Sequence, residues 1–173
     1  MRKLRKILLS TIFALTVSTT FFANTAGTQT VTAASGTAVT FKRKVIAYRT
    51  GSVYNFVPMG NAADNRRALN LLMNGNEKKV INIDNNVHID TYLRPGNNTT
   101  INAGKHTITS DKGVIINDPT AASYTNFTNL TINGGIWKNS SSSGLAGTMM
   151  RISYASNISI NNATVYTNYE GHG

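Results

Sequence analysis

The nine residues NLTINGGIW, at positions 129–137, carry a motif that the chain repeats on either side. NTTINAGKH occupies positions 98–106, and NISINNATV occupies positions 157–165. In each copy an isoleucine follows Thr or Ser and precedes Asn, and a second Asn stands three residues before the isoleucine. Alternating apolar and polar residues are typical of a β-strand, and the Asn and Gly residues that follow indicate a break in it.

The spacing of the copies separates two interpretations. The central isoleucines, Ile101, Ile132 and Ile160, lie 31 and 28 residues apart. Self-similarity at such a period is typical of stacked repeats, in which each strand pairs with its counterpart in the next repeat. An antiparallel sandwich with Asn-rich turns is the alternative, and it explains the strands but not the shared five-position pattern.

The Asn after each isoleucine, at positions 102, 133 and 161, is expected at a sharp corner of the chain. Asn tolerates left-handed backbone geometry, and its side chain can bond to nearby backbone groups. Stacking the repeats would place one Asn above the next in a hydrogen-bonded ladder.

The composition fits a chain of strands and turns in one domain. Only 14% of the 173 residues are charged, and there is no cysteine, which excludes disulfides, thiolate chemistry and Cys-ligated metals. Removing the four basic residues of positions 1–34 lowers the formal net charge from +10 to about +6. This charge is scattered apart from Lys42, Arg43 and Lys44, so it favours an acidic polysaccharide partner over nucleic acid.

Residues 1–34 are predicted to be a secretory signal peptide. A basic start precedes the apolar run 7–17, and small residues before Ser35 offer cleavage after Ala33 or Ala34. A membrane anchor is the alternative, but the apolar run is too short to span a bilayer. We therefore expect a secreted, extracellular protein, exported from a bacterium and without stable membrane insertion after signal removal.

The remaining chain divides into three predicted parts. Residues 35–63 form an extended lead-in or hairpin, and residues 64–74 form a helix with Asp64 as its N-cap, an apolar stripe that includes Leu71, and a stop at Gly75. Everything beyond residue 79 reads as short strands separated by polar turns. The predicted strands are 80–83, 87–89, 100–103, 106–109, 113–116, 130–132, 149–153, 158–160 and 164–166.

From about residue 64 to the end, the chain resembles the pectate-lyase-like superfamily of secreted bacterial, glycosidase-like proteins. The resemblance rests on the helix DNRRALNLLMNG, the entry strand KKVINI, the segment VHIDTYLRPGNNTTINAG and the repeats FTNLTINGGIWKN and ASNISINNATVYTN. It implies an all-β fold, a right-handed parallel β-helix, with a capping helix over residues 64–74 and a coil stack over residues 79–173. Because the chain ends in a predicted turn without a polar cap, we expect a stack truncated at its C-terminal end, the front of a longer protein, whose open end self-associates.

The same resemblance suggests where chemistry would lie. The family places substrate along one parallel sheet, so Arg151, in the strand-like segment 148–153, is a candidate for substrate binding, with the loop 139–147 beside it. The tripeptide GHG at positions 171–173 is similar to one in polygalacturonase-like glycosidases, which makes His172 and Glu170 catalytic candidates. The paired aspartates that those enzymes carry one repeat earlier are missing here.

Hydrolysis of a glycosidic bond needs two carboxyl groups, and no two acids of this chain share a motif. Asp111 and Asp118 flank an apolar strand and are interpreted as turn residues, whereas His88 and His106 are expected to face outward rather than to bind metal. The residues therefore predict no metal site and no cofactor, and Ca²⁺ enters only by analogy with the family.

Two functions follow from these observations. The first is a carbohydrate-active enzyme, a hydrolase or lyase, whose catalytic residues lie mostly beyond residue 173. The second is a non-catalytic surface or adhesin module that binds glycans with the same sheet, and the lack of paired carboxylates favours it for this chain.

Overall fold

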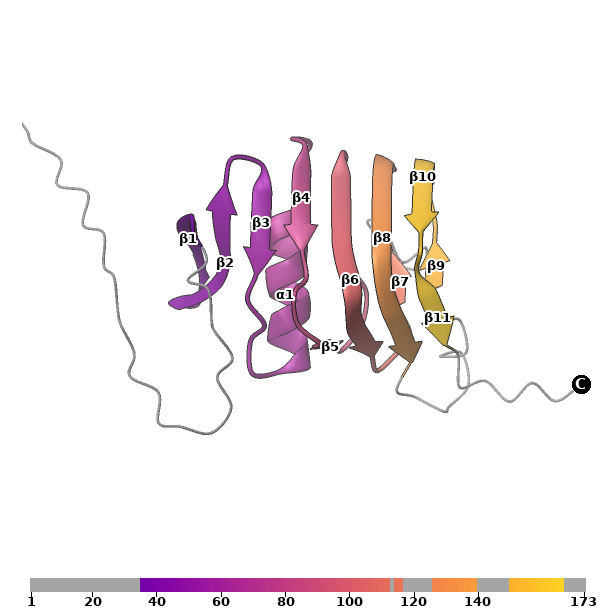
Figure 1. Ribbon diagram of the computed structural model, residues 1–173. Helices are drawn as coiled ribbons and strands as arrows, with labels where there is room; N and C mark the ends of the chain where they lie inside the picture. Colours follow the sequence, from indigo (N-terminus) through magenta and orange to yellow (C-terminus); the bar gives the residue numbers. More distant parts are fainter. Residues whose placement is uncertain (1–34, 113, 117–125, 140–149, 167–173) are drawn as a thin grey trace, which may run out of the picture. The chain divides into compact units, whose positions relative to one another are not determined.

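The computed structural model describes residues 35–112, 114–116, 126–139 and 150–166, which consist mostly of strands with a single helix (Figure 1). In order, the elements are β1 (Thr37–Phe41), β2 (Lys44–Thr50), β3 (Val53–Phe56), α1 (Ala62–Met73), β4 (Lys79–Asn82), β5 (Val87–Ile89), β6 (Thr99–Ser110), β7 (Val114–Ile116), β8 (Phe127–Asn139), β9 (Met150–Ile152), β10 (Ala155–Asn161) and β11 (Thr164–Tyr166). The predicted all-β class is confirmed for these residues.

The main sheet is mixed. Strands β1, β2 and β3 pair antiparallel, and from β3 the order continues through β4, β6, β8 and β10 with parallel pairing throughout (Figure 1). Strand β5 pairs with β6, and β11 pairs with β8, both parallel. Strands β7 and β9 form a separate parallel pair. The lead-in therefore forms an antiparallel hairpin extended by a third strand.

The register of the parallel strands confirms the alignment of the repeats. Ile101 pairs with Ile132, and Ile132 pairs with Ile160. A fourth member that the repeat pattern missed is Ile81 of β4, which pairs with Ile101. Because counterpart strands lie side by side and parallel, the antiparallel-sandwich alternative is wrong for these strands.

The Asn residues that follow these isoleucines form the expected ladder, and it is longer than predicted. Each Nδ2 donates to the Oδ1 of the preceding member. The donor–acceptor distances are 2.9 Å from Asn161 to Asn133, 2.9 Å from Asn133 to Asn102, 3.0 Å from Asn102 to Asn82 and 2.8 Å from Asn82 to Asn55. The ladder therefore ties the antiparallel lead-in to the repeats.

The predicted corner, however, is at the wrong Asn. Asn133 and its counterparts lie within paired strands, while left-handed φ values occur three residues before the isoleucines, at Asn98 (55°), Asn129 (61°) and Asn157 (55°). The parallel register of β8 and β10 passes over Asn129 and Asn157, so these residues form a first bend, ahead of each isoleucine. They make a second ladder, in which Nδ2 of Asn129 donates to Asn98 at 2.7 Å and Nδ2 of Asn157 donates to Asn129 at 3.1 Å.

Two strands are also longer than predicted. Residues 100–103 and 106–109 were expected as separate strands, but both belong to β6, and β8 likewise continues past residue 132. Pairing persists through a second bend, after each isoleucine, where Gly104 lies opposite Gly134 and the register is irregular. The bend therefore changes the direction of each strand without ending its parallel pairing.

The inward residues of these strands form the core. Ile81, Ile101 and Ile132 lie in one buried row, and Ile108 pairs with Trp137 in a second buried row. Full burial of such side chains stabilises a fold by about 1.5–3 kcal/mol each, so the two rows account for much of the driving force for folding.

Helix α1 begins earlier than predicted. Asn61 rather than Asp64 is the N-cap, because its Oδ1 accepts the backbone N–H of Asp64 at 2.8 Å. Asp64 instead lies in the first turn of the helix, where its negative charge interacts favourably with the positive end of the helix dipole. Leu71 departs from the predicted stripe, since 48% of it is exposed, while Leu69 and Leu72 are buried. The helix face that bears Leu71 is thus open to solvent.

Candidate functional site

Most of the residues singled out in the sequence lie outside the described residues, namely His172, Glu170, Asp118 and the loop residues 140–147. Arg151 lies on β9, where its backbone pairs with Ile115 of β7 in the two-stranded sheet. The described residues form several surfaces that could bind a ligand.

A basic hollow lies beside α1, with a volume of about 470 Å³. We call it the arginine hollow. Its lining residues include Phe41, Arg66, Arg67, Asn70, Leu71 and Arg94. The sequence patterns did not indicate it, because Arg94 lies far along the chain from Arg66 and Arg67 and only the fold brings the three together.

Asn70 of α1 connects the helix to the segment that carries Arg94. Its Oδ1 accepts the backbone N–H of Arg94 at 2.7 Å, and its Nδ2 donates to the backbone oxygen of Tyr92 at 3.3 Å. These bonds hold the backbone of Arg94 against the helix. The side chain of Arg94 is exposed and makes no ion pair among the described residues.

Two acids partly balance the positive charge. Arg66 binds Asp90 through two hydrogen bonds, Nε to Oδ1 at 2.6 Å and Nη2 to Oδ2 at 3.3 Å. Hydrogen bonds from Arg66 hold the pKa of Asp90 below its usual value, against the opposing effect of partial burial. Asp64 pairs with Lys42 at 2.9 Å and with Arg67 at 3.5 Å, and the hydrogen bond from Lys42 is the main cause of its lowered pKa. Both acids therefore stay ionised and orient the basic side chains.

The turn between β1 and β2 adds two more cations. Lys42 and Arg43 have φ values of 49° and 62°, and Phe41 before them pairs with Lys44 after them. Hairpin turns with positive φ at both central positions favour Asn-Gly, so two long basic side chains there are unusual. The Lys42–Asp64 pair fixes this basic turn against the start of α1.

Parallel stacking also brings together residues of β5 and β6 that are far apart in the sequence. Ile89 pairs with Ser110, and Asp90 and Asp111 directly follow them at the ends of these two strands. Nε2 of His88 lies 2.6 Å from Oδ1 of Asp111, and both side chains are about half exposed. The outward placement expected for His88 is confirmed, and Asp111 forms a hydrogen bond with His88 that the turn interpretation did not include.

Along the described ranges, no group of three or more His, Cys, Asp or Glu residues is placed to hold a metal ion. In the same residues, no helix is long and apolar enough to cross a membrane.

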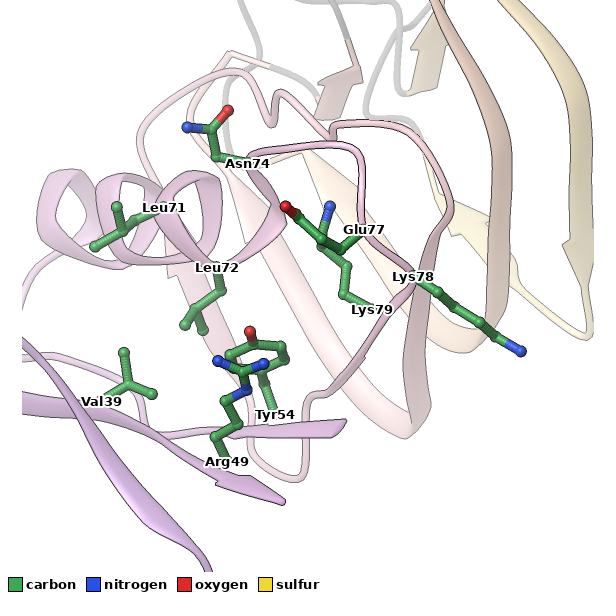
Figure 2. A pocket seen from close by; sticks show the side chains of 9 residues that line it. All are labelled: Val39, Arg49, Tyr54, Leu71, Leu72, Asn74, Glu77, Lys78 and Lys79. Carbon is green, nitrogen blue, oxygen red and sulfur yellow. The ribbon is translucent and has the colours of Figure 1, made fainter. Parts of the chain in front are cut away.

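A further pocket of about 410 Å³ lies on the other side of Leu71 (Figure 2). The buried Lys79 lines it, and its Nζ donates to the backbone oxygens of Gly75 at 2.8 Å and Asn97 at 3.4 Å. Burial lowers the pKa of Lys79, and the nearby Glu77 acts in the opposite direction. Because the ammonium group is bonded to two carbonyls, this lysine ties the end of the helix segment to the sheet.

The outer face of the parallel sheet forms the third surface. Thr100 pairs with Thr131, and Thr131 pairs with Ser159, so their side chains form one row on the face opposite the buried isoleucines. The Asn ladder forms a second row two residues along each strand. Hydroxyl and amide groups thus repeat at the strand spacing, about 4.8 Å.

Comparisons with protein-family models, with curated proteins and with solved structures gave no match. These surfaces and the sequence patterns are therefore the observations that bear on function.

Proposed function

We propose that the chain is a secreted right-handed parallel β-helix protein that binds polysaccharide. The helical winding is supported by the order of pairing. Strands β4 and β5 pair in turn with the first and last parts of β6, and the equivalent parts of β6 and β8 pair again. Successive segments that always meet their counterparts in the same order describe a coil, and parallel crossover connections are right-handed in nearly all proteins.

Export is supported by residues 1–34, with their basic start, short apolar run and small residues before Ser35. The protein would act outside the bacterium that makes it, where polysaccharides are the abundant polymers.

The observation that carries polysaccharide binding is the pair of polar rows on the outer face of the parallel sheet. Each inner Asn of the ladder, such as Asn102 and Asn133, uses one N–H and one lone pair of its side chain within the ladder, which leaves a second N–H and a second lone pair for another partner. The neighbouring row of Thr100, Thr131 and Ser159 adds hydroxyl groups. A repeating polymer with many hydroxyl groups is a suitable partner for such a surface.

Catalysis is the second candidate function, as a glycoside hydrolase or a polysaccharide lyase-like enzyme. It is supported by Asp90 and Asp111, which directly follow the ends of the paired strands β5 and β6, with His88 hydrogen-bonded to Asp111. Glycoside hydrolysis uses two carboxyl groups, one as acid and one as base or nucleophile. Binding alone remains the better-supported function, because Arg66 already holds Asp90 in a two-bond ion pair.

We expect the variant Thr100→Val/Thr131→Val to bind polysaccharide about five- to 150-fold more weakly than the wild type. Valine keeps the shape and strand preference of threonine but removes two hydroxyl groups, each worth about 0.5–1.5 kcal/mol in a hydrogen bond. Affinity electrophoresis against xylan, mannan and polygalacturonate measures the loss.

Thr109→Val is the control, because Thr109 lies near the end of β6, on the outer side, beside His88 of β5 and Lys138 of β8. It should bind as the wild type does. If the wild type binds none of these polymers, or if both variants lose affinity equally, binding by the outer face of the parallel sheet is wrong.

A further inference from the structure

We propose that the arginine hollow binds the phosphodiester groups of an anionic polymer, such as a poly(glycerol phosphate) of the bacterial cell wall. This site is separate from the outer face of the parallel sheet and requires only that the protein is exported. It would hold the protein at a cell envelope while the sheet binds polysaccharide.

Charge is the first argument. Three arginines line the hollow, and Lys42 joins them through the Asp64 carboxylate that it shares with Arg67, so that four basic residues face two acidic ones, Asp64 and Asp90. The arginines are Arg66, Arg67 and Arg94, and the described ion pairs leave an excess of positive charge. Such an excess on one face attracts a polyanion and raises its local concentration.

The second argument is that the cations are held in place before any ligand binds. Arg66 is fixed by Asp90, Lys42 and Arg67 share Asp64, and the backbone of Arg94 is fixed by Asn70. Arg94 keeps its whole guanidinium fork for a ligand, and that fork fits two oxygens of one anionic group.

The directions from which the basic side chains approach the hollow favour a phosphate group over a carboxylate as the ligand. The cations approach the hollow from three parts of the chain, namely α1, the β1–β2 turn and the segment of Arg94. A tetrahedral phosphodiester accepts hydrogen bonds from several directions, whereas a planar carboxylate accepts them mainly in its plane. The partly exposed Phe41 and Leu71 can pack against the carbon backbone between two phosphates.

The left-handed turn gives independent support. Lys42 and Arg43 adopt a backbone conformation that bulky side chains rarely take, and such strained positions gather at ligand-binding sites. Lys42 of this turn pairs with Asp64 in the first turn of α1. A polymer of the cell wall is favoured over a lipid surface, because Leu71 is the sole strongly exposed large apolar side chain among the described lining residues.

The test measures binding of the full chain to poly(glycerol phosphate) by calorimetry at low and at physiological salt. We expect Arg67→Gln/Arg94→Gln to weaken binding at least tenfold and to make it less sensitive to salt. Lys138→Gln is the control, since Lys138 is an exposed cation near the end of β8, and its replacement should change affinity less than twofold. Circular dichroism verifies that each variant is folded.

Two results would overturn the proposal. Equal losses in Lys138→Gln and the arginine variant would mean diffuse attraction by net charge. Tighter binding of polygalacturonate or of phosphatidylglycerol vesicles through the same arginines would assign a different partner. Loss of polysaccharide binding by Thr100→Val/Thr131→Val with intact binding of poly(glycerol phosphate) would support two separate sites, so failure of one proposal is distinguishable from failure of the other.

Discussion

Gly134→Ala should destabilise the protein by about 2–5 kcal/mol, while Gly104→Ala should destabilise it by about 1–2 kcal/mol. Both glycines have left-handed φ values, 71° at Gly134 and 52° at Gly104, and this strains an alanine by about 1–2 kcal/mol. They differ in what a side chain would meet. A Cβ on Gly134 would lie 2.5 Å from the backbone oxygen of Gly104, whereas a Cβ on Gly104 meets nothing within 4 Å.

The extra loss at Gly134 arises because two backbones stack there, and forcing atoms into such a contact costs about 1–3 kcal/mol. Urea denaturation followed by circular dichroism gives both values under identical conditions. Equal destabilisation of the two variants would mean that the two bends do not stack on each other.

Trp137→Ala should destabilise the protein by about 3–5 kcal/mol, the range for removing a large aromatic side chain from a packed core. Trp137 is fully buried, pairs with Ile108 on one side and Val165 on the other, and donates from Nε1 to the backbone oxygen of Gly134 at 3.1 Å. Its removal would leave a cavity between neighbouring strands and would remove the hydrogen bond to the carbonyl of Gly134 at the second bend.

Lys138→Ala is the matched control, one residue along the same strand. Lys138 points outward, and its Nζ lies 5.5 Å from the ring centroid of Tyr166, an exposed contact worth about 0.5–1 kcal/mol. Thermal unfolding should separate the two variants clearly. Similar unfolding temperatures for both would contradict the inward placement of Trp137.

The sequence was sufficient to predict the pairing of the repeats. Ile101, Ile132 and Ile160 could be aligned because three copies share a five-residue pattern, and parallel register then follows from the period alone. Ile81 was missed since β4 keeps only the Ile-Asn pair of the motif and lacks the polar residue before it.

Local geometry was harder to predict. The motif holds two asparagines, and propensity could not decide which of them turns the chain, because Asn is favoured both at left-handed positions and in stacked ladders. The structure places Asn129 at the first bend, ahead of the isoleucine, and Asn133 in the strand. Asn61 and Asp64 posed the same difficulty, since both are good N-caps and only the backbone geometry distinguishes them.

The candidate sites depend on contacts between distant segments. Asp90 and Asp111 are 21 residues apart in the sequence, and only the register of β5 with β6 places them at the ends of two paired strands. The arginine hollow joins α1, the β1–β2 turn and the segment of Arg94, which no repeat or spacing relates to one another in the sequence. A sequence without a repeated or spaced signal gives no way to predict such a surface.

The parallel, in-register stacking of the repeats is tested most directly by an engineered disulfide. The chain has no cysteine, so Thr100→Cys/Thr131→Cys introduces a single pair at directly paired positions. Neighbouring strands lie about 4.8 Å apart, within the range of about 4.4–6.8 Å that a disulfide spans between Cα atoms. Thr100→Cys/Ser159→Cys, two strands apart, is the control at about 10 Å. Mass spectrometry of the oxidised, digested protein at low concentration should find an intramolecular bridge in the first variant and none in the second. A bridge in neither variant, or in both to the same extent, would contradict the stacking on which the fold and the proposed polysaccharide-binding face depend.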